Sequence, residues 1–171
     1  MSLKKFKNIL LILFFCSYFQ NLYAAENLKS LGKFKDWESF VNIQDGNKIC
    51  FAQSIPLVRA PKKLKREPSR LFVSFRPGEN VKNEISLTNG YLFKIGSSVK
   101  AKSGKKSFDL FTKDSFAWLA DNEEDLAMIK KMKKASRFMI MGSTSKGEQT
   151  TDHYSMMGFS KAYTAAKKNC S

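Results

Sequence analysis

The chain has 171 residues, 43% of them hydrophobic, which is enough for one folded domain with a core and excludes an intrinsically disordered protein. Its 30 basic and 15 acidic residues give a formal net charge of +15, which favours anionic partners.

The first 25 residues differ from the rest of the chain. Lysines at positions 4, 5 and 7 precede an unbroken apolar run over residues 9–16, and Ala24 and Ala25 come just before the charged Glu26. This order predicts a secretory signal peptide over residues 1–25 and a single mature domain over residues 26–171. The alternative is an uncleaved anchor, but the run is shorter than the ~20 residues that span a bilayer. Removal of the three lysines would leave a mature charge of +12.

The cysteines agree with export. Cys16 lies in the predicted signal peptide, which leaves Cys50 and Cys170. In an oxidising compartment these two could form a disulfide that closes a loop of about 120 residues. Two separate thiols, or a bridge between chains, are the alternatives.

Most of the mature chain has the alternation of apolar and polar residues that is typical of strands. After a polar lead-in over residues 26–35, the pattern predicts strands over residues 37–44, 49–53, 71–75, 81–88, 91–95, 99–102, 106–111, 137–142 and 148–156. Turn signals such as Asp45-Gly46 and Asn89-Gly90 separate them. Residues 116–118 form a short apolar segment, and the proline-rich residues 55–69 predict an exposed loop.

Two segments have helical spacing. The first, over about residues 122–134, has Asn122 as its predicted cap, acidic residues in its first turn and lysines in its last, which suits the helix dipole. Its predicted apolar stripe consists of Leu126, Ile129 and Met132. The second helix is predicted over about residues 158–168, with apolar residues at 159, 162, 163 and 166.

These elements predict a mainly β fold, a sandwich or partly closed barrel of short antiparallel strands with two short helices. The aromatic residues mostly lie in alternating strands, so we expect them to pack in the core. This expectation covers Trp37, Phe72, Phe75, Tyr91, Phe93, Phe108, Phe111, Trp118, Tyr154 and Phe159.

The sequence predicts no catalytic, metal or cofactor site. His153 is the single histidine, and its neighbours Asp152 and Tyr154 should point to the opposite face of a strand. One histidine and two distant cysteines do not form a metal-ligand cluster, and no phosphate-binding or dinucleotide motif is present. We therefore do not expect an enzyme. A small hydrolase or inhibitor remains an alternative, and it would need Asp152, His153 and Ser155 to converge in a pocket.

The charge is most concentrated between Arg59 and Arg76, where seven basic residues accompany one acid, Glu67. Such a stretch could bind anionic lipid, glycolipid or another anionic glycan. The candidate anion-binding residues are Arg59, Lys62, Lys63, Lys65, Arg66 and Arg70. The alternative is a solvated charged surface, because most basic residues are lysines, which lack the planar fork of arginine. An exported protein is not expected to bind nucleic acid.

Several short segments of the mature chain form a recognisable set: Lys35–Glu38, Lys48–Phe51, Gly90–Lys94, Phe108–Phe111, Ala117-Trp118, Asp125, Met132-Lys133 and Thr150–Asp152. The most specific part is the tail that runs from Tyr154 through Gly158-Phe159-Ser160 to the final cysteine. Together these segments resemble the invasion-associated locus B family of alphaproteobacteria, and the resemblance extends from about Leu31 to Cys170.

The resemblance implies an exported, periplasmic or envelope-associated protein, without catalytic residues, cofactor or defined ligand. We therefore expect a binding module for an envelope component or a host-surface protein. Many members of the family carry a cysteine shortly after the motif tryptophan, but this chain has Phe40 and Val41 there. The resemblance thus implies that Cys50 pairs with Cys170 instead.

Overall fold

The computed structural model describes residues 28–44 and 46–171, so the predicted signal peptide lies outside the described residues. The described chain contains eleven strands, two α-helices and one short 3-10 helix. The strands are β1 (Lys29–Phe34), β2 (Trp37–Gln44), β3 (Asn47–Ser54), β4 (Val58–Ala60), β5 (Arg70–Arg76), β6 (Val81–Thr88), β7 (Ser98–Ser103), β8 (Lys106–Lys113), β9 (Phe116–Trp118), β10 (Arg137–Ser143) and β11 (Gln149–Ser155). The helices are η2 (Pro77–Glu79), α2 (Asn122–Met132) and α3 (Phe159–Asn169).

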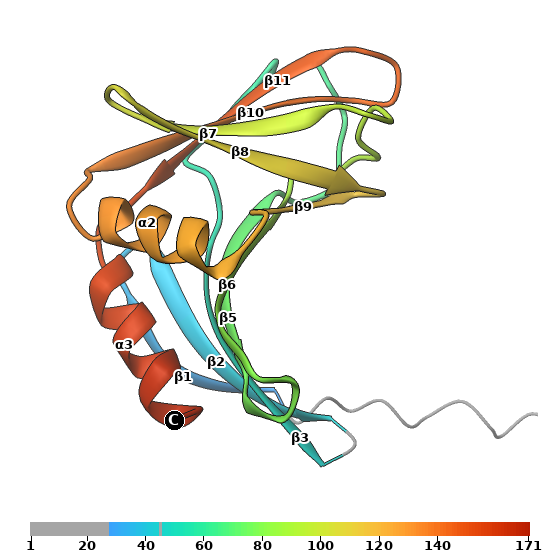
Figure 1. Cartoon of the computed structure of the whole chain (residues 1–171). Coiled ribbons are helices and arrows are strands. Elements are labelled where there is room, and N and C mark those ends of the chain that lie inside the picture. The colour runs from blue at the N-terminus through green and yellow to red at the C-terminus, as the bar shows by residue number, and fades with distance from the viewer. Residues whose placement is uncertain (1–27, 45) are drawn as a thin grey trace, which may run out of the picture.

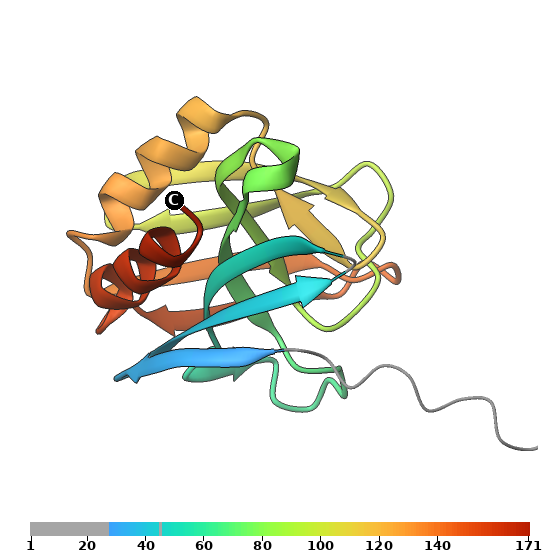
Figure 2. The same ribbon diagram turned by 90° about the horizontal axis from the view of Figure 1, so that it is seen from below.

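All of these strands belong to one antiparallel sheet that does not close, in the order β1-β2-β3-β5-β6-β9-β8-β7-β10-β11-β4. The sheet bends, so that β7, β8, β10 and β11 cross over one end of the half that holds β2, β3, β5 and β6 (Figure 1). Both helices lie on one side of the strands, as the view from below also shows (Figure 2). The predicted mainly β fold with two helices is confirmed.

Alternation of side chains explains the strands that the sequence predicts well. In β5, Leu71, Val73 and Phe75 are buried, and in the β7–β8 hairpin Val99 and Leu110 face the same core. Because successive strand residues point to opposite faces, each such set packs on one side of the sheet. The core is one cluster of buried residues between the bent sheet and the helices.

Helix α3, at the C-terminal end, packs on the N-terminal strands β2 and β3. Phe159 packs edge-to-face on Trp37 of β2 with ring centroids 4.8 Å apart, and the Trp37 indole N–H donates to the Ser155 carbonyl at 2.8 Å. At the end of α3, Cys170 forms a disulfide with Cys50 of β3, with 5.8 Å between the Cα atoms. The predicted disulfide is therefore present, and it links positions 120 residues apart.

Helix α2 differs in detail from its prediction. Asp121, not Asn122, is the cap, and its side chain accepts the backbone N–H of Glu124 at 2.9 Å. Leu126 is 46% exposed, so the predicted stripe is wrong at that position. The buried side of α2 instead consists of Asp125, Met128, Ile129 and Met132.

Three other expectations are corrected. The polar lead-in contains β1, which pairs with the free edge of β2. The predicted exposed loop over residues 55–69 contains β4, which pairs with β11. Residues 91–95 are not a strand: Phe93 makes an isolated bridge to Thr144, and its backbone N–H donates to the Asp114 carbonyl.

The expectation for the aromatic residues is wrong for part of the set. Trp37, Phe75 and Phe159 are buried as expected, but Phe111 is 52% exposed. Phe72 and Trp118 are only half-buried. These side chains lie on the face of the sheet opposite to its buried residues, because strand positions alternate between faces.

None of the helices in the described residues combines the length and the apolar character that crossing a membrane requires.

Candidate anion-binding loop

The basic stretch identified in the sequence connects the two halves of the sheet. We use "basic loop" for residues 61–69, which run from β4 to β5. Strand β4 pairs with β11, and β5 pairs with β3 and β6, so both ends of the basic loop are hydrogen-bonded into the sheet.

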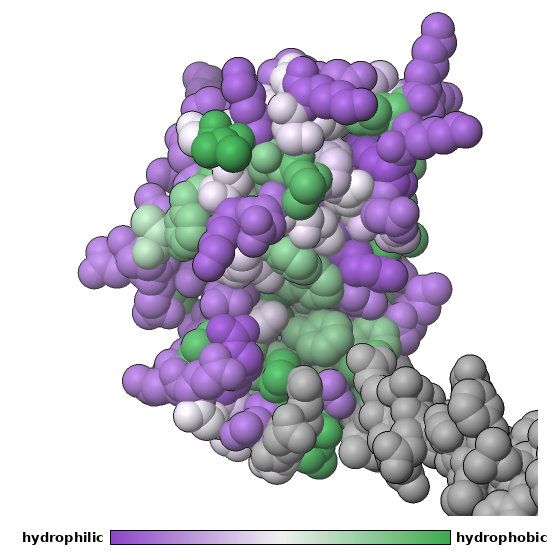
Figure 3. All heavy atoms as spheres, turned by 90° about the vertical axis from the view of Figure 1, so that its right-hand side faces the viewer, coloured by the Kyte–Doolittle hydropathy of each residue, from purple (hydrophilic) through white to green (hydrophobic). Residues whose placement is uncertain are grey.

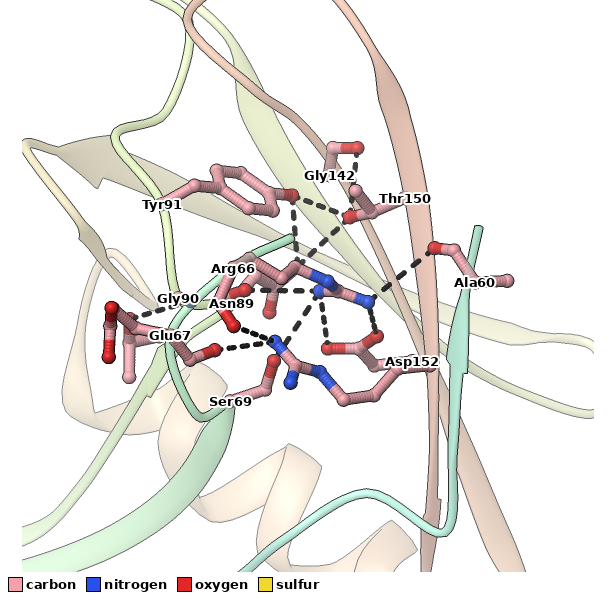
Figure 4. A network of polar contacts seen from close by, with 12 residues as sticks. Ala60, Arg66, Glu67, Ser69, Asn89, Gly90, Tyr91, Gly142, Thr150 and Asp152 are labelled. Carbon is pink, nitrogen blue, oxygen red and sulfur yellow. Dashed lines mark hydrogen bonds and ion pairs between the residues drawn. The ribbon is translucent and has the colours of Figure 1, made fainter. Parts of the chain in front are cut away.

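A buried ion pair holds the middle of the basic loop. The Arg66 guanidinium donates from Nη1 to Asp152 Oδ2 at 3.0 Å and from Nη2 to Asp152 Oδ1 (Figure 4). The side chains of Arg66 and Asp152 are 2% and 0% exposed. A bidentate arginine–carboxylate pair fixes both distance and orientation, so it sets the position of the loop against β11.

Arginine groups also bind the backbone of the loop and its neighbours. Arg66 Nη1 donates to the Asn89 carbonyl at 3.0 Å. Arg59, which is opposite Asp152 in the β4–β11 register, donates to the carbonyl of Glu67. The backbone N–H of Glu67 in turn donates to the Gly90 carbonyl at 3.0 Å. These contacts cross-link the basic loop to the segment after β6.

The approach at Gly90 leaves no room for a side chain. A Cβ atom added there would lie 1.9 Å from the Glu67 carbonyl oxygen, and Gly90 has a φ of 76°. Both facts require glycine at this position. The turn signal Asn89-Gly90 seen in the sequence thus has a second role as the contact surface for the basic loop.

A group of hydroxyl and amide side chains extends the network behind Arg66. Asn89 Nδ2 donates to the Tyr91 hydroxyl at 3.2 Å, and that hydroxyl lies 2.5 Å from Thr150 Oγ1. Burial raises the pKa of Tyr91, so it stays a neutral donor and acceptor. The Arg66 guanidinium lies 5.9 Å from the centre of the Tyr91 ring (Figure 4).

The lysines of the basic loop lie on its outer side, away from the polar network around Arg66. Lys62 and Lys63 occupy the central positions of a turn closed by the Leu64 N–H, which donates to the Pro61 carbonyl at 3.3 Å. These two lysines and Lys65 are exposed. Within the described part of the chain, none of the three forms an ion pair.

The structure therefore divides the six candidate residues into three groups. Arg59 and Arg66 form internal contacts, and the three lysines face solvent. Arg70 is half-buried and lines a separate hollow of about 310 Å³ beside Trp37 and Lys35. The polar partners of the loop were not identified from sequence, because Asp152 is 86 positions from Arg66.

The geometry around His153 does not assemble a triad. Asp152 faces the interior and binds Arg66, whereas His153 is half-buried on the opposite face of β11. The Ser155 hydroxyl accepts the backbone N–H of Met157 at 3.1 Å. In the residues that the structure describes, no group of three or more potential metal-ligating side chains comes together.

Comparison with known proteins gives a likeness of fold. No protein-family model and no curated protein sequence matches the chain. Among solved structures, the crystal structure of invasion associated protein B from Bartonella henselae is similar, with a TM-score of 0.57 and 14% sequence identity. The match covers 82% of this chain and 98% of that one. At this identity the similarity shows a shared fold, in agreement with the predicted relationship at the level of structure.

Proposed function

We propose that the protein is an exported, non-catalytic interaction module of the bacterial cell envelope, and that it binds anionic lipid or glycolipid through Lys62, Lys63 and Lys65. The observation that carries the proposal is that the arginines and the lysines of the basic stretch have different environments. Arg59 and Arg66 form hydrogen bonds within the protein, and the Arg66–Asp152 pair holds the loop in place. The three lysines on the same loop remain exposed.

Because the backbone of the basic loop is held in place, its exposed lysines are favourably arranged for binding. Each lysine near an anionic membrane surface contributes about 1 kcal/mol at moderate salt. A loop that is already ordered loses less conformational entropy on binding than a mobile one. Three lysines would thus contribute about 3 kcal/mol, equivalent to roughly 150-fold in affinity.

Export is supported by two independent features, one in the sequence and one in the structure. The N-terminal segment has the order of a signal peptide, and the Cys50–Cys170 disulfide is compatible with an oxidising compartment. Under this proposal the mature protein lies in the periplasm or on the envelope, where its partner is a lipid head group, another envelope component or a host-surface protein.

Vesicle binding tests the loop. Phosphatidylcholine vesicles with and without phosphatidylglycerol are sedimented with the mature protein at low and physiological salt. We expect binding only to the anionic vesicles, weakened by salt and by at least about 100-fold in the Lys62→Glu, Lys63→Glu, Lys65→Glu variant. Unchanged binding by this variant would refute the role of the basic loop.

A matched control separates the loop from the bulk charge of the protein. Lys102, Lys105 and Lys106 are exposed lysines of the β7–β8 hairpin, and their reversal to glutamate changes the net charge by the same amount. We expect this control to bind nearly as well as the unmodified protein. An equal loss in both variants would show that binding depends on overall charge alone.

Fractionation tests export separately. We expect the protein in the periplasmic or envelope fraction, with a new N-terminus close to Glu26. A cytoplasmic protein that retains Met1 would refute the proposed location.

A further inference from the structure

Aromatic side chains gather on the face of the sheet that turns away from the helices. Six of them are half-buried or exposed there: Phe40, Phe51, Phe72, Phe111, Phe116 and Trp118. The side of the molecule away from the helices has a band of hydrophobic side chains between hydrophilic ones (Figure 3). The solvent face of an antiparallel sheet is normally polar, so this concentration calls for an explanation.

We call these six side chains the aromatic row. Three of them, on β8 and β9, form a continuous platform at one end of it. Phe111 and Trp118 are direct partners in the β8–β9 register, with ring centroids 5.8 Å apart and ring planes 27° from parallel. Phe116 lies two residues before Trp118 on the same strand face, at the same centroid distance and 28° from parallel. The three rings therefore lie side by side and form one aromatic surface.

Beside this platform lies a hollow of about 800 Å³, where β9 leads into α2. Trp118 and Phe111 line one part of it, and the start of β6, the connection from β9 to α2 and the first turn of α2 line most of the rest. The hollow is separate from the basic loop, with which it shares no residue.

Two residues that line the hollow carry hydrogen-bonding groups without a partner in residues 28–44 and 46–171. Trp118 Nε1 donates to no acceptor among the described residues, unlike the indole N–H of Trp37. Asp125 is 8% exposed, and its Oδ1 accepts the Ile85 N–H at 2.8 Å. No described residue donates to the second oxygen of Asp125, Oδ2. One donor and one acceptor thus remain open beside the rings.

The charges around the hollow nearly balance. Lys82 and Lys113 accompany the carboxylates of Glu84, Asp121 and Asp125. Both oxygens of Glu84 accept hydrogen bonds from Arg76 at 2.9 Å, so its charge is already compensated. A strongly charged ligand would gain little here, in contrast to the basic loop.

We propose that this hollow is a binding site for a neutral hexopyranose unit of a glycan, stacked on the Trp118–Phe111 platform. A pyranose ring has an apolar C–H face that can cover an aromatic ring, whose face is electron-rich. Its hydroxyl groups both donate and accept, which matches the free Asp125 oxygen and the Trp118 N–H. A purely apolar ligand would leave these polar groups without partners at a cost in free energy.

The two tryptophans of the chain provide a direct assay. The indole N–H signals of Trp37 and Trp118 are followed by two-dimensional ¹H–¹⁵N NMR while chitotetraose or lacto-N-tetraose is added to the disulfide-bonded protein. The titration extends to several millimolar sugar, so that it detects a site with a dissociation constant of about 1 mM. We expect a saturable shift of the Trp118 signal at that concentration and little change at Trp37.

The two sugars distinguish the source of the ligand. A shift with chitotetraose indicates the β-1,4-linked N-acetylhexosamine type found in bacterial walls, and a shift with lacto-N-tetraose indicates the neutral type found on animal cells. Either result supports the site. The absence of a saturable Trp118 shift with both sugars, in the folded unmodified protein, would overturn the proposal.

Variants locate the contact. Trp118→Ala should weaken sugar binding by about tenfold or more, since it removes the stacking surface, and Trp118→Phe should retain part of it. Phe40→Ala is the matched control, because Phe40 belongs to the same aromatic row but does not line the hollow. An equal loss of sugar affinity in Phe40→Ala would indicate that the sugar binds along the whole aromatic row, and it would contradict a site at Trp118. Vesicle binding through the basic loop should be unaffected by Trp118→Phe, so the two proposals can fail independently.

Discussion

Replacement of Arg66 by methionine tests whether the buried ion pair holds the basic loop. The substitution keeps a long apolar side chain but removes the guanidinium. Asp152, whose side chain is 0% exposed, would then be a buried carboxylate without its cationic partner. The carbonyl of Asn89 would also lose its hydrogen bond from Arg66.

The magnitude follows from the burial. Removal of one member of a buried pair typically costs about 3–5 kcal/mol, because the remaining charge is left uncompensated. The total stability of a domain is about 5–15 kcal/mol, so Arg66→Met should remove a large part of it. The double variant Arg66→Met, Asp152→Leu leaves no buried charge, and it should recover most of the loss.

An exposed pair supplies the reference. Lys100 and Asp109 are 2.7 Å apart, but their side chains are 57% and 58% exposed. Lys100→Met should therefore cost less than about 1 kcal/mol. Both are cation–carboxylate pairs, but only the Arg66–Asp152 pair is buried and bidentate.

Equilibrium unfolding in urea, monitored by tryptophan fluorescence and circular dichroism, measures these differences. We expect the order unmodified, Lys100→Met, double variant, Arg66→Met from most to least stable. An Arg66→Met cost no larger than that of Lys100→Met, or a double variant no more stable than Arg66→Met, would refute the reasoning.

Two further predictions concern stability. Replacement of Cys50 and Cys170 by alanine should lower the free energy of unfolding by up to about 5 kcal/mol, because the disulfide closes a loop across 120 positions; an unchanged urea midpoint would contradict this. Burial raises the pKa of Asp125 to about 6, so the folded state binds this proton more tightly than the unfolded chain does. Stability from this group is therefore present at low pH, and up to about 3 kcal/mol of it is lost as the pH rises from about 4 to about 6. Asp125→Asn keeps an acceptor for the Ile85 N–H without the charge, so its unfolding free energy should vary less over this range and exceed that of the unmodified protein at pH 7. Equal pH dependence in the two proteins would contradict this assignment.

The candidate sites show where sequence reasoning stops. The seven basic residues between Arg59 and Arg76 were visible as a cluster, but their different roles were not. Arg66 is internal only because β11 places Asp152 beside it, and no local pattern encodes this contact. Likewise, alternation located Phe72 and Trp118 in strands but did not tell which face would be covered. That depends on where the helices pack.

By itself, the sequence determined the local elements, since strand and helix periodicity and turn residues depend on near neighbours. It was sufficient for most strands, both helices and the mainly β class. The edge strands β1 and β4 depended on partners, because short polar or proline-rich segments become strands only where a neighbouring strand offers its hydrogen-bonding edge. The tertiary structure alone decided that Arg66 pairs with Asp152, and that Trp118 and the start of β6 line one hollow. Both arise from packing between segments far apart in the chain, and sequence proximity carries no information about such contacts.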